Sequence, residues 1–248
     1  MSDYKKKVIV DSMTMEEILK ILADDSKFLQ HKIDENKKKY RRFLNTTRKD
    51  RVFYNPLTYK SAAGFNYVIQ FFKRAYDEKE RDKLGVLYYI WFMKSEETNT
   101  GRKRGVYAVT VSRLSLGNQW TWHFTVYKPH FMDRYKERCL DDCSIPRLDA
   151  FHQFFLNNLK MSSSGRPSEK YPKGYWMACN EGLCLCNRLE GFTVEVATFV
   201  DYATAGIEKK QFAYDAKQAM LDIGFELNLP EENFDDFEEE QAICEERK

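Results

Sequence analysis

Four consecutive runs of aromatic and β-branched residues constrain the fold of this chain more than any other feature of its sequence. Each run is seven or eight residues long, and charged or Gly/Asn-containing segments separate one run from the next. Short runs of this composition, bounded by turn residues, are typical of consecutive antiparallel strands. Alternation along a strand places Trp122, Phe124 and Val126 on one face of the last run and His123 on the other. The predicted strands are residues 65–72, 85–92, 105–111 and 120–126.

Helical patterns lie before and after these runs. From residue 12 to residue 44 apolar residues recur at steps of three and four, Ser12 can cap the helix, and Glu16 and Glu17 suit its positive end. Pro129 suits the first turn of a second helix. Residues 162–168 are rich in serine and are predicted to form a flexible basic loop. Further helices are predicted at residues 147–159 and 208–223, and further strands at residues 175–179, 183–189 and 193–200.

The order of these elements predicts the fold class. A helix, strands, two helices, strands and a last helix follow one another, which predicts an α+β fold with a largely antiparallel sheet and helices packed on it. We expect an N-terminal helical segment with a basic end at residues 1–50, an α+β core domain at residues 51–205, and a C-terminal helix with an acidic tail at residues 206–248.

Charge is divided unevenly along the chain, although the net charge is only +2. Residues 201–248 hold 5 Lys and Arg against 14 Asp and Glu, which leaves 35 bases and 24 acids, or +11, for residues 1–200. A basic body suits a protein that meets a polyanion such as RNA, and an acidic tail suits self-inhibition or a protein partner. The alternative is a tail that only keeps the protein soluble.

Composition argues against several other classes of protein. No apolar run reaches the roughly 18 residues that span a bilayer, and residues 8–10 are too short for the apolar part of a signal peptide. We therefore expect a cytoplasmic protein that does not bind membranes. The six cysteines form no C-x-x-C pair, so we expect reduced, buried thiols and neither a metal nor another cofactor. A zinc site is the alternative for five of them: Cys139, Cys143, Cys179, Cys184 and Cys186.

One histidine and two arginines are spaced to share a face of the helix that starts near Pro129. Residues four apart on a helix lie one above the other, so His130, Arg134 and Arg138 form a row. An imidazole titrates near neutral pH and guanidinium groups stabilise developing negative charge, which is the chemistry that phosphodiester cleavage needs. The alternative is an exposed helix face, on which the arginines pair with neighbouring carboxylates and the histidine caps or packs.

Three segments together resemble a known ribonuclease family. They are the run from His130 to Arg138, the residues 176–182 (Trp-Met-Ala-Cys-Asn-Glu-Gly), and the strand end at residues 196–200 (Val-Ala-Thr-Phe-Val). The combination resembles the RelE/barnase/EndoU-type (BECR-fold) ribonuclease superfamily, and is most similar to small phage and bacterial members of toxin or accessory type. The resemblance covers roughly residues 128–202 and rests on short motifs.

The resemblance implies a metal-independent endoribonuclease that cleaves RNA by attack of a 2′-hydroxyl. It implies His130 as the acid/base residue, Arg134 as the group that neutralises the scissile phosphate with help from Arg138, and Thr198 as a hydroxyl donor. The chain departs from the family in its large aromatic sheet before His130 and in an insertion at residues 162–173. It also has no second histidine near Thr198, so that His123 or Tyr127 would have to supply the partner.

Two basic patches suggest contacts with nucleic acid. Arg102, Lys103 and Arg104 occupy the turn between two predicted strands, and Lys38 and Arg41 belong to a cationic helix end. The alternative is that both patches are ordinary solvated surface. A non-catalytic nucleic-acid-binding or protein-interaction subunit of a larger assembly is therefore the alternative to the ribonuclease.

Overall fold

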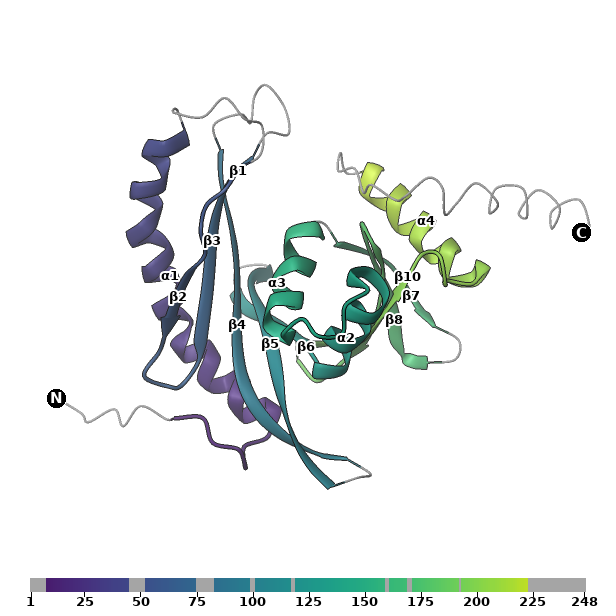
Figure 1. Cartoon of the computed structure of the whole chain (residues 1–248), viewed down its shortest axis with the longest axis horizontal. Coiled ribbons are helices and arrows are strands. Elements are labelled where there is room, and N and C mark those ends of the chain that lie inside the picture. Colours follow the sequence, from purple (N-terminus) through teal and green to yellow (C-terminus); the bar gives the residue numbers. More distant parts are fainter. Residues whose placement is uncertain are drawn as a thin grey trace, which may run out of the picture. The chain divides into compact units, whose positions relative to one another are not determined.

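The computed structural model describes residues 8–44, 52–74, 83–98, 101–116, 119–158, 161–168, 171–191 and 193–222. The chain divides into two compact units, Met1–Phe124 and Thr125–Lys248, and each unit is described by itself. Figure 1 shows the helices and strands of both. The division falls inside residues 51–205, which the sequence predicts as one core domain. The acidic tail beyond residue 222 lies outside the described residues.

Helix α1 (Met15–Leu44) is the long N-terminal helix that the sequence predicts. Its cap is Thr14, not Ser12. The N–H of Thr14 donates to Glu17 Oε2 (2.8 Å), and the N–H of Glu17 donates to Thr14 Oγ1 (3.2 Å). This reciprocal pair satisfies amide groups that the start of a helix leaves without partners. One stripe of the helix is buried: Ile18, Leu19, Leu22, Leu29, Ile33 and Tyr40.

The sheet of the first unit has the strand order β1–β3–β4–β5–β6, with β2 paired to β3. The pairings of β1 and β2 with β3, of β3 with β4 and of β4 with β5 are antiparallel. The four predicted strands are confirmed, whereas the sequence pattern missed the short strands β1 and β2. The strands are β1 (Val52–Phe53), β2 (Leu57–Lys60), β3 (Asn66–Arg74), β4 (Lys83–Thr98), β5 (Gly101–Leu116) and β6 (Gln119–Tyr127), the last of which ends in the second unit.

Aromatic side chains join α1 to this sheet. The rings of Tyr40 on α1 and Phe71 on β3 stack with their centroids 4.5 Å apart, and Phe28 lies 5.3 Å from Tyr67. The hydroxyl of Tyr67 is buried and donates to Asp25 Oδ2 over 2.7 Å, so its polar end has a partner. The face of the sheet that carries Tyr67 and Phe71 is therefore the core of the first unit.

The second unit packs helices on both faces of an antiparallel sheet. Its strands lie in the order β10–β9–β8–β7. The rings of Phe131, Tyr135 and Phe154, which come from two helices, surround Phe199 on one face. The elements are α2 (Pro129–Tyr135), the π-helix η1 (Lys136–Leu140), α3 (Arg147–Asn157), β7 (Met161–Ser168), β8 (Tyr171–Cys179), β9 (Gly182–Arg188), β10 (Thr193–Asp201) and α4 (Ile207–Asp222).

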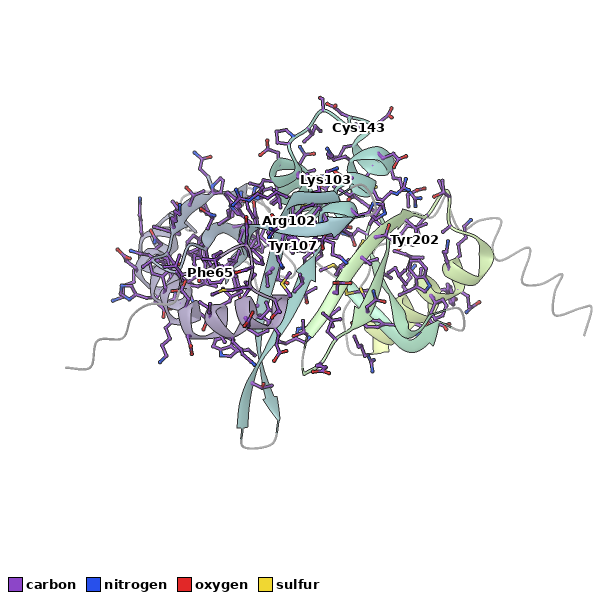
Figure 2. The ribbon with its side chains drawn as sticks, turned by 90° about the horizontal axis from the view of Figure 1, so that it is seen from below. Phe65, Arg102, Lys103, Tyr107, Cys143 and Tyr202 are labelled. Carbon is purple, nitrogen blue, oxygen red and sulfur yellow. The ribbon has the colours of Figure 1, made fainter. Side chains whose placement is uncertain are left out.

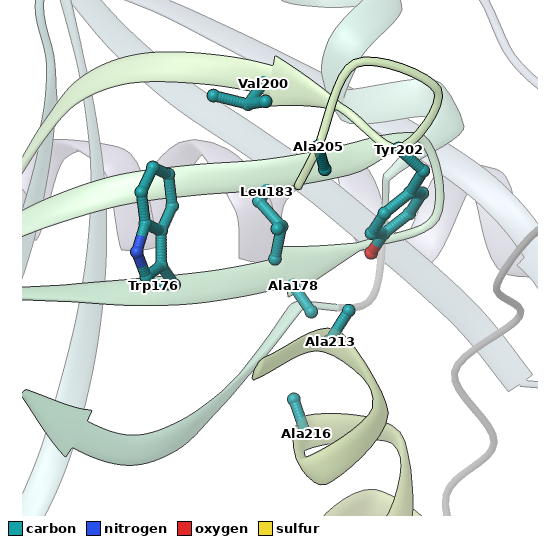
Figure 3. Close-up of a cluster of buried hydrophobic side chains, with 8 residues drawn as sticks. All are labelled: Trp176, Ala178, Leu183, Val200, Tyr202, Ala205, Ala213 and Ala216. Carbon is teal, nitrogen blue, oxygen red and sulfur yellow. The ribbon is translucent and has the colours of Figure 1, made fainter. Parts of the chain in front are cut away.

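The opposite face of this sheet is covered by α4. Figure 3 shows Ala213 and Ala216 of α4 directed at the side chains of the strands. All members of this cluster are buried, and the small alanine side chains let the helix approach the strands closely. The cluster consists of Trp176, Ala178, Leu183, Val200, Tyr202, Ala205, Ala213 and Ala216.

The fold class is confirmed as α+β with a largely antiparallel sheet and an N-terminal helix. One local prediction is wrong: residues 162–168 form most of strand β7 and not a flexible loop. β7 pairs with β8 from Met161↔Cys179 to Ser168↔Tyr171, with two register shifts around Pro167. Backbone pairing along an edge needs no apolar side chains, so the serine-rich composition concealed the strand.

Gly182 provides a test of the packing of the second unit. A Cβ atom at this position would overlap the carbonyl oxygen of Val200 and the ring of Phe199. We expect Gly182→Ala to lower the free energy of unfolding by about 1–3 kcal/mol, because neither neighbour can move without disturbing β10. Urea denaturation followed by tryptophan fluorescence measures the change.

Gly206→Ala is the matched control, because a Cβ there meets nothing within 4 Å. We expect it to change the free energy of unfolding by less than about 1 kcal/mol. Equal stability of the two variants would contradict the close packing at the turn between β8 and β9.

Candidate functional site

Helix α2 presents two of the four predicted catalytic residues, His130 and Arg134, on its outer side. It buries Phe131, Met132 and Tyr135, and this leaves His130 exposed and Arg134 half-buried. His130 and Arg134 therefore lie one turn apart on the outer side of α2, as the spacing predicts.

The two arginines are already engaged by the protein. Arg134 Nη1 lies 2.6 Å from Glu137 Oε2, an ion pair between partly exposed side chains. Arg138 lies in η1, where the turn is wider than in an α-helix, and its Nη1 donates to the carbonyl oxygen of Phe199 over 3.0 Å. The pairing of Arg134 with Glu137 is the alternative that the sequence left open.

Thr198 points away from the face that carries α2. It pairs with Leu185 directly after a β-bulge in β10 and lies on the same face as Val200, which belongs to the cluster under α4. Phe199 points to the other face and contacts Phe131 of α2. Thr198 and His130 therefore lie on opposite sides of the sheet, and the expected grouping of the two is not found.

The two residues considered as partners for His130 are placed elsewhere. Tyr127 is fully buried and its ring lies 5.3 Å from Phe131 and 4.9 Å from Phe151. His123 belongs to the first unit, where its Nδ1 lies 3.4 Å from Ser112 Oγ and burial lowers the pKa of its ring. Neither residue completes an acid/base pair with His130 within one unit.

A carboxylate on α2 is held by an arginine of α3. Arg147 donates from Nε and Nη2 to the two oxygens of Asp133, over 2.8 and 2.7 Å. Partial burial acts to raise the pKa of Asp133, but the hydrogen bonds from Arg147 and the positive charges of Arg147, Lys136 and His130 outweigh it, so that the pKa lies below its ordinary value. This bidentate pair fixes α2 against α3.

Glu181, which sequence reasoning did not single out as a site residue, is the centre of a polar network. Its carboxylate accepts hydrogen bonds from Tyr135 Oη (2.7 Å), Asn157 Nδ2 (2.8 Å) and Asn158 Nδ2 (2.6 Å). Its N–H donates to Asn158 Oδ1 over 3.0 Å. The network joins the β8–β9 turn to α2 and α3, and a lone glutamate in a turn carries no sequence signal of this role.

The buried cysteines are part of the core. Cys179, Cys184 and Cys186 have no exposed surface, which confirms the expectation of buried thiols for these three. Burial raises the pKa of Cys184 and Cys186, and a thiol in that state is a poor nucleophile and metal ligand. Within the described ranges, no three His, Cys, Asp or Glu side chains are grouped so as to hold a metal ion. The zinc alternative gains no support.

The first basic patch lies on a two-stranded hairpin. Residues 101–104 at the start of β5 are all exposed, and Figure 2 labels Arg102 and Lys103 there. In the register of β4 and β5, Arg102 lies opposite Glu97, Lys103 opposite Glu96, and Arg104 opposite Ser95. Arg104 Nε also lies 3.8 Å from Asp11 Oδ1, a long and exposed contact that contributes little.

The second basic patch is the end of α1. Lys38, Lys39 and Arg41 are exposed and form no ion pair with any residue in the described part of the chain. Cations also suit the negative end of a helix dipole, so their position alone has a structural explanation. The aromatic residue beside them, Tyr40, is buried against Phe71 and cannot stack on a base.

In comparisons with known proteins, no protein-family model, no curated protein and no solved structure matches this chain. Among the helices in the described ranges, none is long and apolar enough to cross a membrane.

The Asp133–Arg147 pair predicts a pH dependence of stability. The pKa of Asp133 is lower in the folded protein than in the unfolded chain, so the pair stabilises the fold above the ordinary aspartate pKa. This stabilisation is lost as the pH falls through the lower, folded value. We expect Asp133→Asn to cost roughly 1 kcal/mol at pH 7, and the difference from wild type to shrink below about pH 4.

Thermal unfolding at a series of pH values measures this difference. Asp149→Asn, on α3, is the control, since no ion pair of Asp149 is found with the described residues. A constant difference between wild type and Asp133→Asn from pH 7 to pH 3 would contradict the role of the pair.

Proposed function

We propose that this chain is a nucleic-acid-binding protein that does not cleave its ligand. The observation that carries the proposal is the run of consecutive exposed cations at Arg102, Lys103 and Arg104, on the hairpin in which β4 and β5 pair as far as Thr98↔Gly101. The charge of residues 1–200, +11, has the same sign. Phosphate contacts by lysine and arginine supply most of the non-specific affinity of proteins for nucleic acid.

The state of the predicted catalytic residues favours binding over cleavage. Arg134 is paired with Glu137, Arg138 is turned to a backbone carbonyl, and Thr198 is on the far face of the sheet. Metal-independent cleavage needs an acid/base group and a charge-stabilising group aimed at the same phosphate. Of the four residues that the resemblance implies, His130 and Arg134 meet that requirement in part.

The second candidate is the endoribonuclease that the sequence resemblance implies. The observation that favours it is the exposure of His130 one turn from Arg134 on α2. If Arg134 leaves Glu137 when a phosphate arrives, the exchange costs little, because exposed ion pairs contribute at most about 1 kcal/mol.

A single experiment separates the two candidates. We expect the full-length protein to bind labelled nucleic acid in EDTA, with affinity falling steeply from 50 to 200 mM salt, and to leave total RNA intact over hours. Fluorescence anisotropy measures the binding, and gel electrophoresis measures the cleavage.

His130→Ala is the informative variant, and His31→Ala, an exposed histidine of α1, is its control. Under the binding proposal, both variants bind as wild type does. Cleavage by wild type and by His31→Ala, but not by His130→Ala, would replace the binding proposal with the endoribonuclease. Absence of binding to every nucleic acid tested would remove both.

A further inference from the structure

The hairpin of β4 and β5 continues past the strand beside it. β3 pairs with β4 only from Arg74↔Lys83 to Asn66↔Trp91, whereas the pairing of β4 with β5 goes on from Met93↔Val106 to Thr98↔Gly101. These last six residue pairs, which we name the arm, form a two-stranded ribbon about 20 Å long. Figure 1 shows the ends of β4 and β5 extending beyond the end of β3.

The arm has more cations than acids: it carries Lys94, Arg102, Lys103 and Arg104 against Glu96 and Glu97, a net charge of +2. Side chains alternate along a strand, so Arg102 and Arg104 share one face and Lys103 takes the other, with Lys94 beside it on β4. Arg102, Lys103 and Arg104 are exposed. Two acids belong to the arm: Glu96 lies opposite Lys103 and Glu97 lies opposite Arg102. No aromatic residue occurs among residues 93–98 or 101–106.

We propose that the arm binds in the major groove of double-stranded DNA. This inference rests on the proposed function and names its ligand class. The major groove of B-form DNA is about 12 Å wide and admits a two-stranded β-ribbon. The A-form major groove of duplex RNA is deep and too narrow for side chains to read. Single strands are held chiefly by stacking on aromatic side chains, and the arm carries none.

The spacing of the two arginines fits the repeat of a duplex. Residues two apart in a strand are separated by about 6.8 Å, which matches two base steps of about 3.4 Å along one strand of DNA. Arginine can donate two parallel hydrogen bonds to the edge of a guanine. Arg102 and Arg104 therefore read bases, and Lys103, on the other face, contacts phosphate as a point charge.

The test compares three ligands of one sequence: a DNA duplex of about 20 base pairs, the corresponding RNA duplex, and the single-stranded RNA. We expect the full-length protein to bind the DNA duplex at least tenfold more tightly than either RNA at 150 mM salt. The triple variant Arg102→Thr, Lys103→Thr, Arg104→Thr is expected to lose that preference and to lower the salt slope by about one for each cation that contacts phosphate. Circular dichroism checks that it is folded.

The triple variant Lys38→Ala, Lys39→Ala, Arg41→Ala removes the same charge from the end of α1, and we expect it to keep the preference for the DNA duplex. The double variant Arg102→Lys, Arg104→Lys keeps the charge but removes the paired donors. We expect it to retain the salt slope of wild type and to lose discrimination among duplexes of different sequence.

Three outcomes would overturn the inference. The first is that the protein binds the RNA duplex or the single-stranded RNA as tightly as the DNA duplex. The second is that the triple threonine variant of the arm binds the DNA duplex as wild type does. Either result leaves the proposed function unchanged. A change of oligomeric state in the arm variant, with DNA binding intact, would show that the arm joins two copies of the chain. Absence of all nucleic-acid binding by wild type would instead remove the proposed function itself.

Discussion

Packing of aromatic rings between α2 and β10 determines where the polar residues of the second unit lie. Phe131 and Tyr135 are fully buried against Phe199, at ring-centroid distances of 6.1 and 5.3 Å. Because these rings face inward, His130 and Arg134 face outward, and Arg134 pairs with Glu137 of the adjoining η1. A buried aromatic side chain contributes far more free energy than an exposed ion pair, so the rings decide the orientation of the helix.

The same packing explains why the spacing of His130 and Arg134 does not by itself assemble the site that the sequence resemblance implies. A His-x-x-x-Arg spacing ensures a common helix face and nothing more, whereas catalysis depends on what stands opposite that face. Here the strand hydroxyl expected to stand there, that of Thr198, is directed toward α4. Consecutive exposed cations lie instead on a hairpin of the first unit, at Arg102, Lys103 and Arg104.

Regular alternation and helical periodicity made most of the fold predictable. The four aromatic runs became β3 to β6 because their alternating apolar side chains must be buried, and α1 formed where its apolar stripe indicated. Strand β7 could not be predicted, since its serine-rich sequence carries no hydrophobic pattern. The sequence also did not predict that the helix starts at Thr14, because Ser12 is an equally suitable cap. The reciprocal hydrogen bonds between Thr14 and Glu17 decide the start.

The candidate site was less predictable than the fold because one extra residue in β10 changes the face of all that follows. Val196 pairs with Cys186 and Thr198 with the adjacent Leu185, so the bulge at this point reverses the alternation. Without the bulge, Thr198 would lie on the same face of the sheet as Val196. The residue types in this stretch do not predict a bulge. The role of Glu181 likewise could not be predicted, because it depends on the packing of α3 against the β8–β9 turn.

The π-helix η1 likewise changes which residues share a face of the helix. In a turn closed by bonds from residue i to residue i+5, each residue advances by a smaller angle about the axis than in an α-helix. The row that joins His130 to Arg134 therefore does not continue to Arg138, which is directed inward to Phe199. Between residues 136 and 140, an alignment with any relative that has a uniform α-helix here would need a one-residue gap before equivalent positions coincide.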